Sequence, residues 1–137
     1  MKMRVMYLSK KAKMVTYAEA IGQACGCLVN DIPPAYPADN EKLVIIGITA
    51  GAALDDKVRR FCGELIPQRA KNVALFVDGA AGSKAELEAK RILKDAGTNV
   101  IDETYYVKCG IFGGKITIEE RQAIVDWSRK MQDLAAK

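Results

Sequence analysis

The chain of 137 residues contains no histidine. Histidine is the commonest metal ligand, and its ordinary pKa lies near neutral pH, so its absence removes the commonest general base. The acidic residues that could replace it as ligands do not have the spacing of a calcium-binding loop. They are Asp31, Asp39, Glu41, Asp55 and Asp56. The sequence therefore predicts no metal site.

Long apolar runs are also missing. The longest extends from Leu43 to Leu54 and is interrupted by Gly47, Thr49 and Gly51, whereas a membrane-spanning helix needs about 20 apolar residues. The expected strand after the N-terminal Met-Lys-Met is too short for the core of a signal peptide. We therefore expect a soluble, cytoplasmic protein with no membrane association.

The sequence has four cysteines and a small net charge. The single residue between Cys25 and Cys27 fits neither a zinc knuckle nor the redox motif with two intervening residues, and Cys62 and Cys109 stand alone. Buried free thiols are the favoured interpretation. The net charge of +4 comes from dispersed basic residues, so no nucleic-acid site is expected. A mildly basic surface suits an acidic partner or an anionic ligand.

What is present is ordinary globular material: 50% of the residues are hydrophobic and 28% are charged. The length suits a single domain over residues 1–137, and no repeat or linker divides it. The proline-rich stretch "PPAYPADN" excludes regular structure locally.

Apolar periodicity predicts strands that alternate with helices. Strands are expected at 4–8, 27–32, 43–49, 73–77 and 99–107, and helices at about 14–25, 54–65, 84–96 and 118–134. Ser83–Glu86 and Thr117–Glu120 have the pattern of capping boxes at the starts of two helices. This order predicts an α/β fold: a doubly wound, five-stranded parallel sheet with helices on both faces. Ligands of such sheets bind at the carboxyl ends of the strands.

The stretch "YLSKKAKMVTYAEAIG" joins the first strand to the first helix. A strand–turn–helix of this kind offers backbone N–H groups to a phosphate. The turn contains three lysines around one alanine, with no glycine and one hydroxyl. It is either a phosphate-binding turn built on charge or a solvated basic turn.

Four stretches resemble the flavodoxin family and together cover nearly the whole chain. They are "YLSKKAKMVTYAEAIG", "KLVIIGITAGAALDDKVRRFC", "NVALFVDGAAGS" and "YYVKCGIFGGKITIEERQAIVDW". Within the last, "FGGKI" is similar to the branch that contains flavodoxin-like protoporphyrinogen oxidases. The resemblance implies a flavodoxin-like fold and noncovalent binding of flavin mononucleotide (FMN).

In the family, the phosphate loop reads hydroxyl, any residue, hydroxyl, glycine, any residue, hydroxyl. Ser9 matches the first hydroxyl, whereas Lys11, Ala12 and Met14 stand in place of the second hydroxyl, the glycine and the third hydroxyl. The resemblance implies cofactor contacts from three loops. They are Ser9, Lys10, Lys11, Ala12, Lys13 and Met14; Thr49, Ala50, Gly51 and Ala52; and Asp78, Gly79, Ala80, Ala81 and Gly82.

The second and third loops contain none of the aromatic residues that family members commonly stack on the flavin ring. Aliphatic side chains such as Met14 or Leu54, or a partner protein, would have to replace them; an empty pocket is the other interpretation. No catalytic residue is predicted.

Three hypotheses follow. The first is a redox protein that uses FMN for electron transfer or flavin-dependent reduction, with a redox partner protein or a small-molecule electron acceptor. The second is an accessory or interaction module of the same fold that has lost flavin binding. The third is a phosphate-handling enzyme that depends on Cys109 or Ser9, and the lack of a neighbouring base disfavours it.

Overall fold

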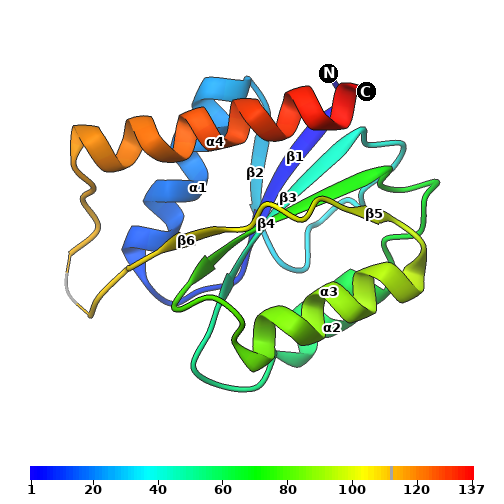
Figure 1. Cartoon of the computed structure of the whole chain (residues 1–137), viewed down its shortest axis with the longest axis horizontal. Coiled ribbons are helices and arrows are strands. Elements are labelled where there is room, and N and C mark those ends of the chain that lie inside the picture. Colours follow the sequence, from blue (N-terminus) through cyan, green and yellow to red (C-terminus); the bar gives the residue numbers. More distant parts are fainter. Residues whose placement is uncertain (112) are drawn as a thin grey trace.

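A parallel β-sheet separates two layers of helices (Figure 1). The computed structural model describes residues 1–111 and 113–137, and the stretch "FGGKI" therefore begins outside the described residues. The strands are β1 (Met3–Tyr7), β2 (Leu28–Asp31), β3 (Leu43–Thr49), β4 (Asn72–Asp78), β5 (Asn99–Val100) and β6 (Tyr105–Val107). The helices are α1 (Ala12–Cys25), α2 (Asp56–Gly63), α3 (Lys84–Ala96) and α4 (Ile118–Ala136).

The strand order is β2-β1-β3-β4-β5, with every pair parallel, and β6 also pairs with β4. Helices α1 and α4 cover one face of the sheet, and α2 and α3 cover the other (Figure 1). This confirms the predicted doubly wound α/β fold of the flavodoxin type. The order reverses between β1 and β3, and this switch point is where ligands bind in open parallel sheets.

The last strand differs from the prediction. Residues 99–107 were expected to form one strand, but β5 pairs with the start of β4 and β6 with its end, and the chain leaves the ladder between them. There the indole N–H of Trp127 donates to the carbonyl of Glu103 at 2.7 Å. Four residues, 101–104, lie opposite only two residues of β4, 74–75, so a continuous ladder cannot form there. Among the described residues the sheet therefore contains six strands. Because β5 and β6 lie one after the other beside β4, these strands fill five positions across the sheet.

Each face of the sheet has its own core. Met14, Tyr17 and Ile21 of α1 pack with α4 against one face, and Val58 and Phe61 of α2 pack with α3 against the other. Trp127 lies in the first core, where its ring packs edge-to-face with Phe76 and lies beside Tyr105. Both β3 and β4 contribute residues to each cluster. Continuous burial of β3 on both faces explains its unbroken apolar sequence.

Side chains cap three of the four described helices. The predicted capping box of α4 is confirmed, because Thr117 and Glu120 each accept the other's backbone N–H at 3.0 Å. The box of α3 is only half formed. Ser83 accepts from the N–H of Glu86, but the Glu86 carboxylate accepts from the N–H of Gly82 and from the side chains of Lys90 and Tyr106. Gly82 and Lys90 are local partners four residues from Glu86, and Tyr106 comes from β6. Together they occupy the carboxylate that a complete box would offer to the Ser83 N–H.

Within the described residues, no helix combines the length and the apolar character that crossing a membrane requires.

Candidate functional site

The three predicted cofactor loops lie at the same edge of the sheet, because each follows the carboxyl end of a strand. The first follows β1, the second follows β3 and the third follows β4 (Figure 1). All fifteen predicted residues therefore belong to one region of the fold. Their side chains and amides, however, do not all face one cavity.

The first loop leaves the N-terminus of α1 open. Ser9 Oγ accepts the N–H of Lys11 at 3.0 Å, and the N–H of Met14 donates to the carbonyl of Lys11 at 3.1 Å. No side chain caps this helix, its first turn has no acidic residue, and Lys11 is in an extended conformation. Among residues 1–111 and 113–137, the N–H groups of Ala12 and Lys13 have no acceptor. The positive end of the helix dipole is therefore unopposed.

The side chains of this loop point in different directions. Lys10 is exposed. Lys13 lies 3.5 Å from the Glu120 carboxylate, which also accepts the Tyr17 hydroxyl, so Lys13 faces α4. Met14 is fully buried in the core, and its N–H is bonded within the turn. The Met14 side chain is therefore not available for stacking on a flavin ring, because its position in α1 faces the sheet. Its assignment to the cofactor site stays a prediction.

An ion pair joins the first loop to the third. Lys11 Nζ lies 2.8 Å from Asp78 Oδ2, and the N–H of Cys109 donates to Asp78 Oδ1 at 3.0 Å. Burial alone would raise the pKa of Asp78, but the hydrogen bonds from Lys11 and Cys109 outweigh it and lower that pKa. The hydrogen bond to Asp78 raises the pKa of Lys11. Both groups are therefore charged at neutral pH.

The second and third loops pack against each other at their bases. The N–H of Ala50 donates to the carbonyl of Asp78 at 3.0 Å, and the N–H of Gly79 donates to that of Val107 at 3.1 Å. Gly79 has φ +145°, and a Cβ there would lie 2.5 Å from Ala50 Cβ. Gly79 therefore allows a contact that no other residue would allow. Ala80, Ala81 and Gly82 beyond it are exposed, as are Gly51 and Ala52.

A cavity of about 300 Å³ lies at the switch point of the sheet. The first loop contributes Leu8, Ser9 and Lys10 to its lining; the second loop and α2 contribute Thr49, Ala50, Ala52, Ala53, Leu54, Asp55, Lys57 and Val58. Among residues 1–111 and 113–137, no aromatic residue and no residue of the third loop lines it. The cavity therefore unites two of the three predicted loops, while the third is linked through the Lys11–Asp78 ion pair.

Sequence reasoning missed several features of this edge. Lys57 is an exposed residue of α2 that was not among the predicted site residues, yet it lines the cavity. The carboxylate of Asp78 was not recognised as the partner of Lys11. The segment after β6 covers the start of α1, where the Thr16 hydroxyl donates to the carbonyl of Gly114. From the sequence, only the opposite charges of the first-loop lysines and of the acid that ends β4 could have indicated the Lys11–Asp78 pair.

Within the part of the chain that the structure describes, no group of three or more His, Cys, Asp or Glu residues is placed to hold a metal ion.

Several solved structures share this architecture. A flavodoxin from the domain Archaea has a TM-score of 0.69 at 15% identity, with all of both chains covered. Flavodoxin 2 from Bacillus cereus has a TM-score of 0.66 at 13% identity, with 97% of this chain and 99% of that chain covered. The flavodoxin of Streptococcus pneumonia TIGR4 has a TM-score of 0.67 at 11% identity, with 96% and 97% covered. No protein-family model and no curated protein sequence matches the chain. The likeness shows the fold of the chain.

Proposed function

We propose that this flavodoxin-like domain binds FMN noncovalently and serves in electron transfer or flavin-dependent reduction. The observation that carries the proposal is the uncapped start of α1 beside the switch-point cavity. There the amides of Ala12 and Lys13 have no acceptor among the described residues, and Ser9 and Lys10 line the cavity. A phosphate at a helix N-terminus is stabilised by such amides and by the helix dipole.

The donors of the first loop fit a phosphate group. The Ser9 hydroxyl accepts from Lys11 through its oxygen, so its own hydrogen remains available to donate. Lys10 adds an exposed positive charge worth on the order of 1 kcal/mol beside a dianion. Lys11 contributes little to phosphate binding, because Asp78 already neutralises its charge. The site therefore depends more on backbone donors and Lys10 than on hydroxyl side chains.

The flavin ring would extend from the first loop into the cavity and contact Ala50, Ala52 and Leu54. Without an aromatic partner, the ring forfeits about 0.5–1.5 kcal/mol of stacking energy beyond buried area. When bound, the flavin supplies the electron chemistry, and the protein holds the phosphate and leaves the ring open. An open ring suits a redox partner protein or a small-molecule electron acceptor.

One observation favours a second candidate function, an accessory or interaction module of this fold without flavin. The Lys11–Asp78 ion pair joins the first and third loops through the protein's own side chains. In such a module, this ion pair would stabilise the loops at the carboxyl ends of the strands, which a bound cofactor would stabilise in a flavin-binding protein. The two candidates differ in whether the purified protein carries a chromophore.

The test is a visible absorption spectrum of freshly purified protein, followed by titration of FMN and riboflavin against flavin fluorescence. FMN should bind more tightly than riboflavin, which lacks the phosphate. Lys10→Glu replaces one attraction by one repulsion and should weaken FMN binding by about 1–2 kcal/mol, or roughly five- to thirtyfold, without affecting riboflavin.

The matched control is Lys71→Glu, a reversal of equal charge on an exposed residue just before β4, at the opposite edge of the sheet. It should leave FMN binding unchanged. A colourless protein that binds neither flavin, or equal losses in both variants, would reject the proposed FMN site and favour the accessory module.

A further inference from the structure

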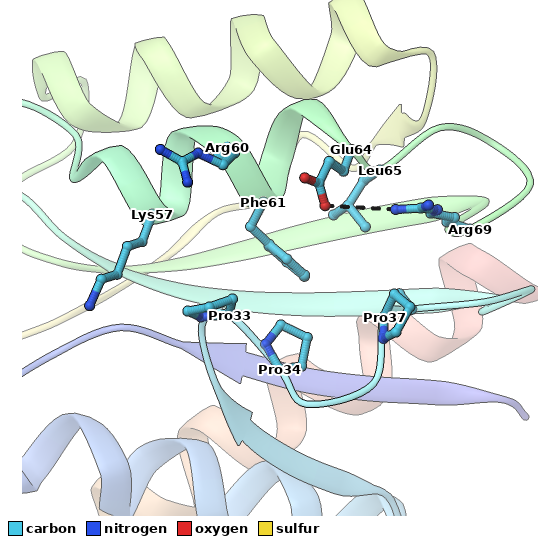
Figure 2. Close-up of a pocket in the computed structure, with 10 residues that line it drawn as sticks. Pro33, Pro34, Pro37, Lys57, Arg60, Phe61, Glu64, Leu65 and Arg69 are labelled. Atoms are coloured by element: carbon cyan, nitrogen blue, oxygen red, sulfur yellow. Dashed lines mark ion pairs between the residues drawn. The ribbon is translucent and has the colours of Figure 1, made fainter.

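A second cavity lies between the proline-rich loop and α2, away from the loops considered above. Its volume is about 160 Å³. Figure 2 shows Pro33, Pro34 and Pro37 on one side and the side chains of α2 on the other, with Phe61 pointing toward the prolines. Of the described residues, Lys57 alone lines both this cavity and the switch-point cavity.

The floor of the cavity is apolar and rigid. Ala38, Phe61 and Leu65 are nearly fully buried beneath it, and the proline rings have few rotatable bonds. Apolar cavities of about 150 Å³ accommodate benzene in other proteins. This cavity therefore has room for one ring-sized apolar group.

The charged residues at the rim of the cavity differ between its two ends. Lys57 and Arg60 lie toward one end, and Glu64 and Arg69 lie toward the other, where they form an ion pair at 3.7 Å (Figure 2). Neither Lys57 nor Arg60 is in an ion pair with a described residue. The nearby Asp56 is bound to Arg59, and Asp55 caps α2 by accepting the N–H of Lys57. One end of an apolar cavity thus presents two positive charges without a carboxylate partner.

From this arrangement we infer that the cavity binds a small monocarboxylate with one ring-sized apolar group, such as an aromatic acid. The apolar group packs on Phe61 and the prolines. The carboxylate meets Lys57 and Arg60, and the charge of Glu64 is paired with Arg69. A guanidinium matches a carboxylate in planar, two-point geometry, and the apolar floor disfavours a more strongly hydrated phosphate.

The probes are benzoate, the neutral benzamide of the same shape, and the cationic benzylamine. Each is titrated into the ¹⁵N-labelled full chain without flavin, and the amides of Ala35, Ala38, Phe61 and Leu65 report on the cavity. Benzoate should give saturable shifts there with a Kd of about 1–10 mM, as expected for a fragment-sized ligand. Benzamide should bind roughly three- to tenfold more weakly, and benzylamine should not saturate.

Lys57→Gln combined with Arg60→Gln should remove the preference for benzoate and leave benzamide binding unchanged. The matched control, Arg91→Gln with Lys94→Gln, removes the same charge from α3 outside the cavity and should keep the preference.

Three results would overturn the inference: no saturable shifts at the four reporter amides, shifts centred on residues 9–13, or equal loss of the preference in the control pair. The wild-type comparison of benzoate with benzamide is decisive by itself if the double variant folds poorly. Because the titrations contain no flavin, their outcome does not depend on whether FMN binds at the switch point.

Discussion

The ammonium of Lys11 lies 2.8 Å from the carboxylate of Asp78, although the two residues are 67 positions apart in the sequence. The Asp78 side chain is buried and the Lys11 side chain is partly exposed. The carboxylate also accepts the N–H of Cys109. This one acidic group therefore connects the loop after β1, the end of β4 and the segment after β6.

Asp78→Asn should destabilise the protein in a pH-dependent manner. The folded state lowers the pKa of Asp78, so the carboxylate contributes stability above its unfolded pKa of about 4, and the contribution is lost as the pH falls through the folded pKa. At pH 7 the variant should lose about 1–3 kcal/mol of unfolding free energy, the contribution of a charged hydrogen bond. Urea unfolding at pH 7, 5 and 3 should show this difference shrinking below pH 4. A difference that stays constant with pH would mean that charge is not its origin.

The same substitution should strengthen anion binding at the start of α1. Asp78→Asn leaves the Lys11 ammonium without a carboxylate, so its charge becomes available to a phosphate near Ala12. One additional exposed pair contributes up to about 1 kcal/mol, which corresponds to roughly two- to fivefold tighter FMN binding. Fluorescence titration measures the change, with riboflavin as the ligand that should not respond. Tighter binding of both flavins would instead indicate a rearranged cavity.

Much of the fold could be predicted because its determinants are local. The unbroken apolar run at Leu43–Thr49 is β3 with the expected bounds. Gly97 ends α3 in the left-handed conformation that glycine adopts easily. Tyr105 packs on Trp127 while the Tyr106 hydroxyl reaches Glu86 of α3, so the two tyrosines face opposite sides of the sheet, as a strand requires.

The features that escaped prediction depend on partners distant in sequence. The last strand is interrupted between Val100 and Tyr105, where the carbonyl of Glu103 accepts the indole N–H of the distant Trp127. The second capping box is incomplete in part because the distant Tyr106 donates its hydroxyl to the Glu86 carboxylate. At the candidate site, strand order placed the three loops together, but it did not reveal that one of the lysines of the first loop pairs with Asp78. Element order determines which loops meet, whereas side-chain pairing depends on tertiary geometry.

Gly79→Ala should separate the second and third loops. Gly79 has φ +145°, and an added Cβ would lie 2.5 Å from Ala50 Cβ. Backbone strain and the displaced contact should together cost about 2–4 kcal/mol, measured as a lower urea midpoint. Combining it with Ala50→Gly removes the contact but not the strain, so the double variant should recover only part of the loss. Full recovery would show that the backbone conformation of Gly79 carries no strain.

The four thiols should divide into two classes of reactivity. Cys62 and Cys109 are buried, whereas Cys25 and Cys27 are partly exposed around the end of α1. Burial raises the pKa of the Cys62 thiol to about 12, and burial together with the Asp78 charge raises that of Cys109 to about 12. At pH 8 both are almost entirely protonated, and a thiol reacts as its thiolate.

Iodoacetamide should therefore modify Cys25 and Cys27 in the native protein, and Cys62 and Cys109 only when the protein unfolds. Peptide mass spectrometry after timed labelling, with and without urea, distinguishes the four sites. Cys27 should react more slowly than Cys25, because burial raises the pKa of the Cys27 thiol to about 11. The variant Cys25→Ser/Cys27→Ser should retain two protected thiols. Rapid native labelling of Cys109 would contradict the closed packing around Asp78, since its N–H is bonded to that carboxylate and its thiol becomes accessible only if the segment after β6 moves away.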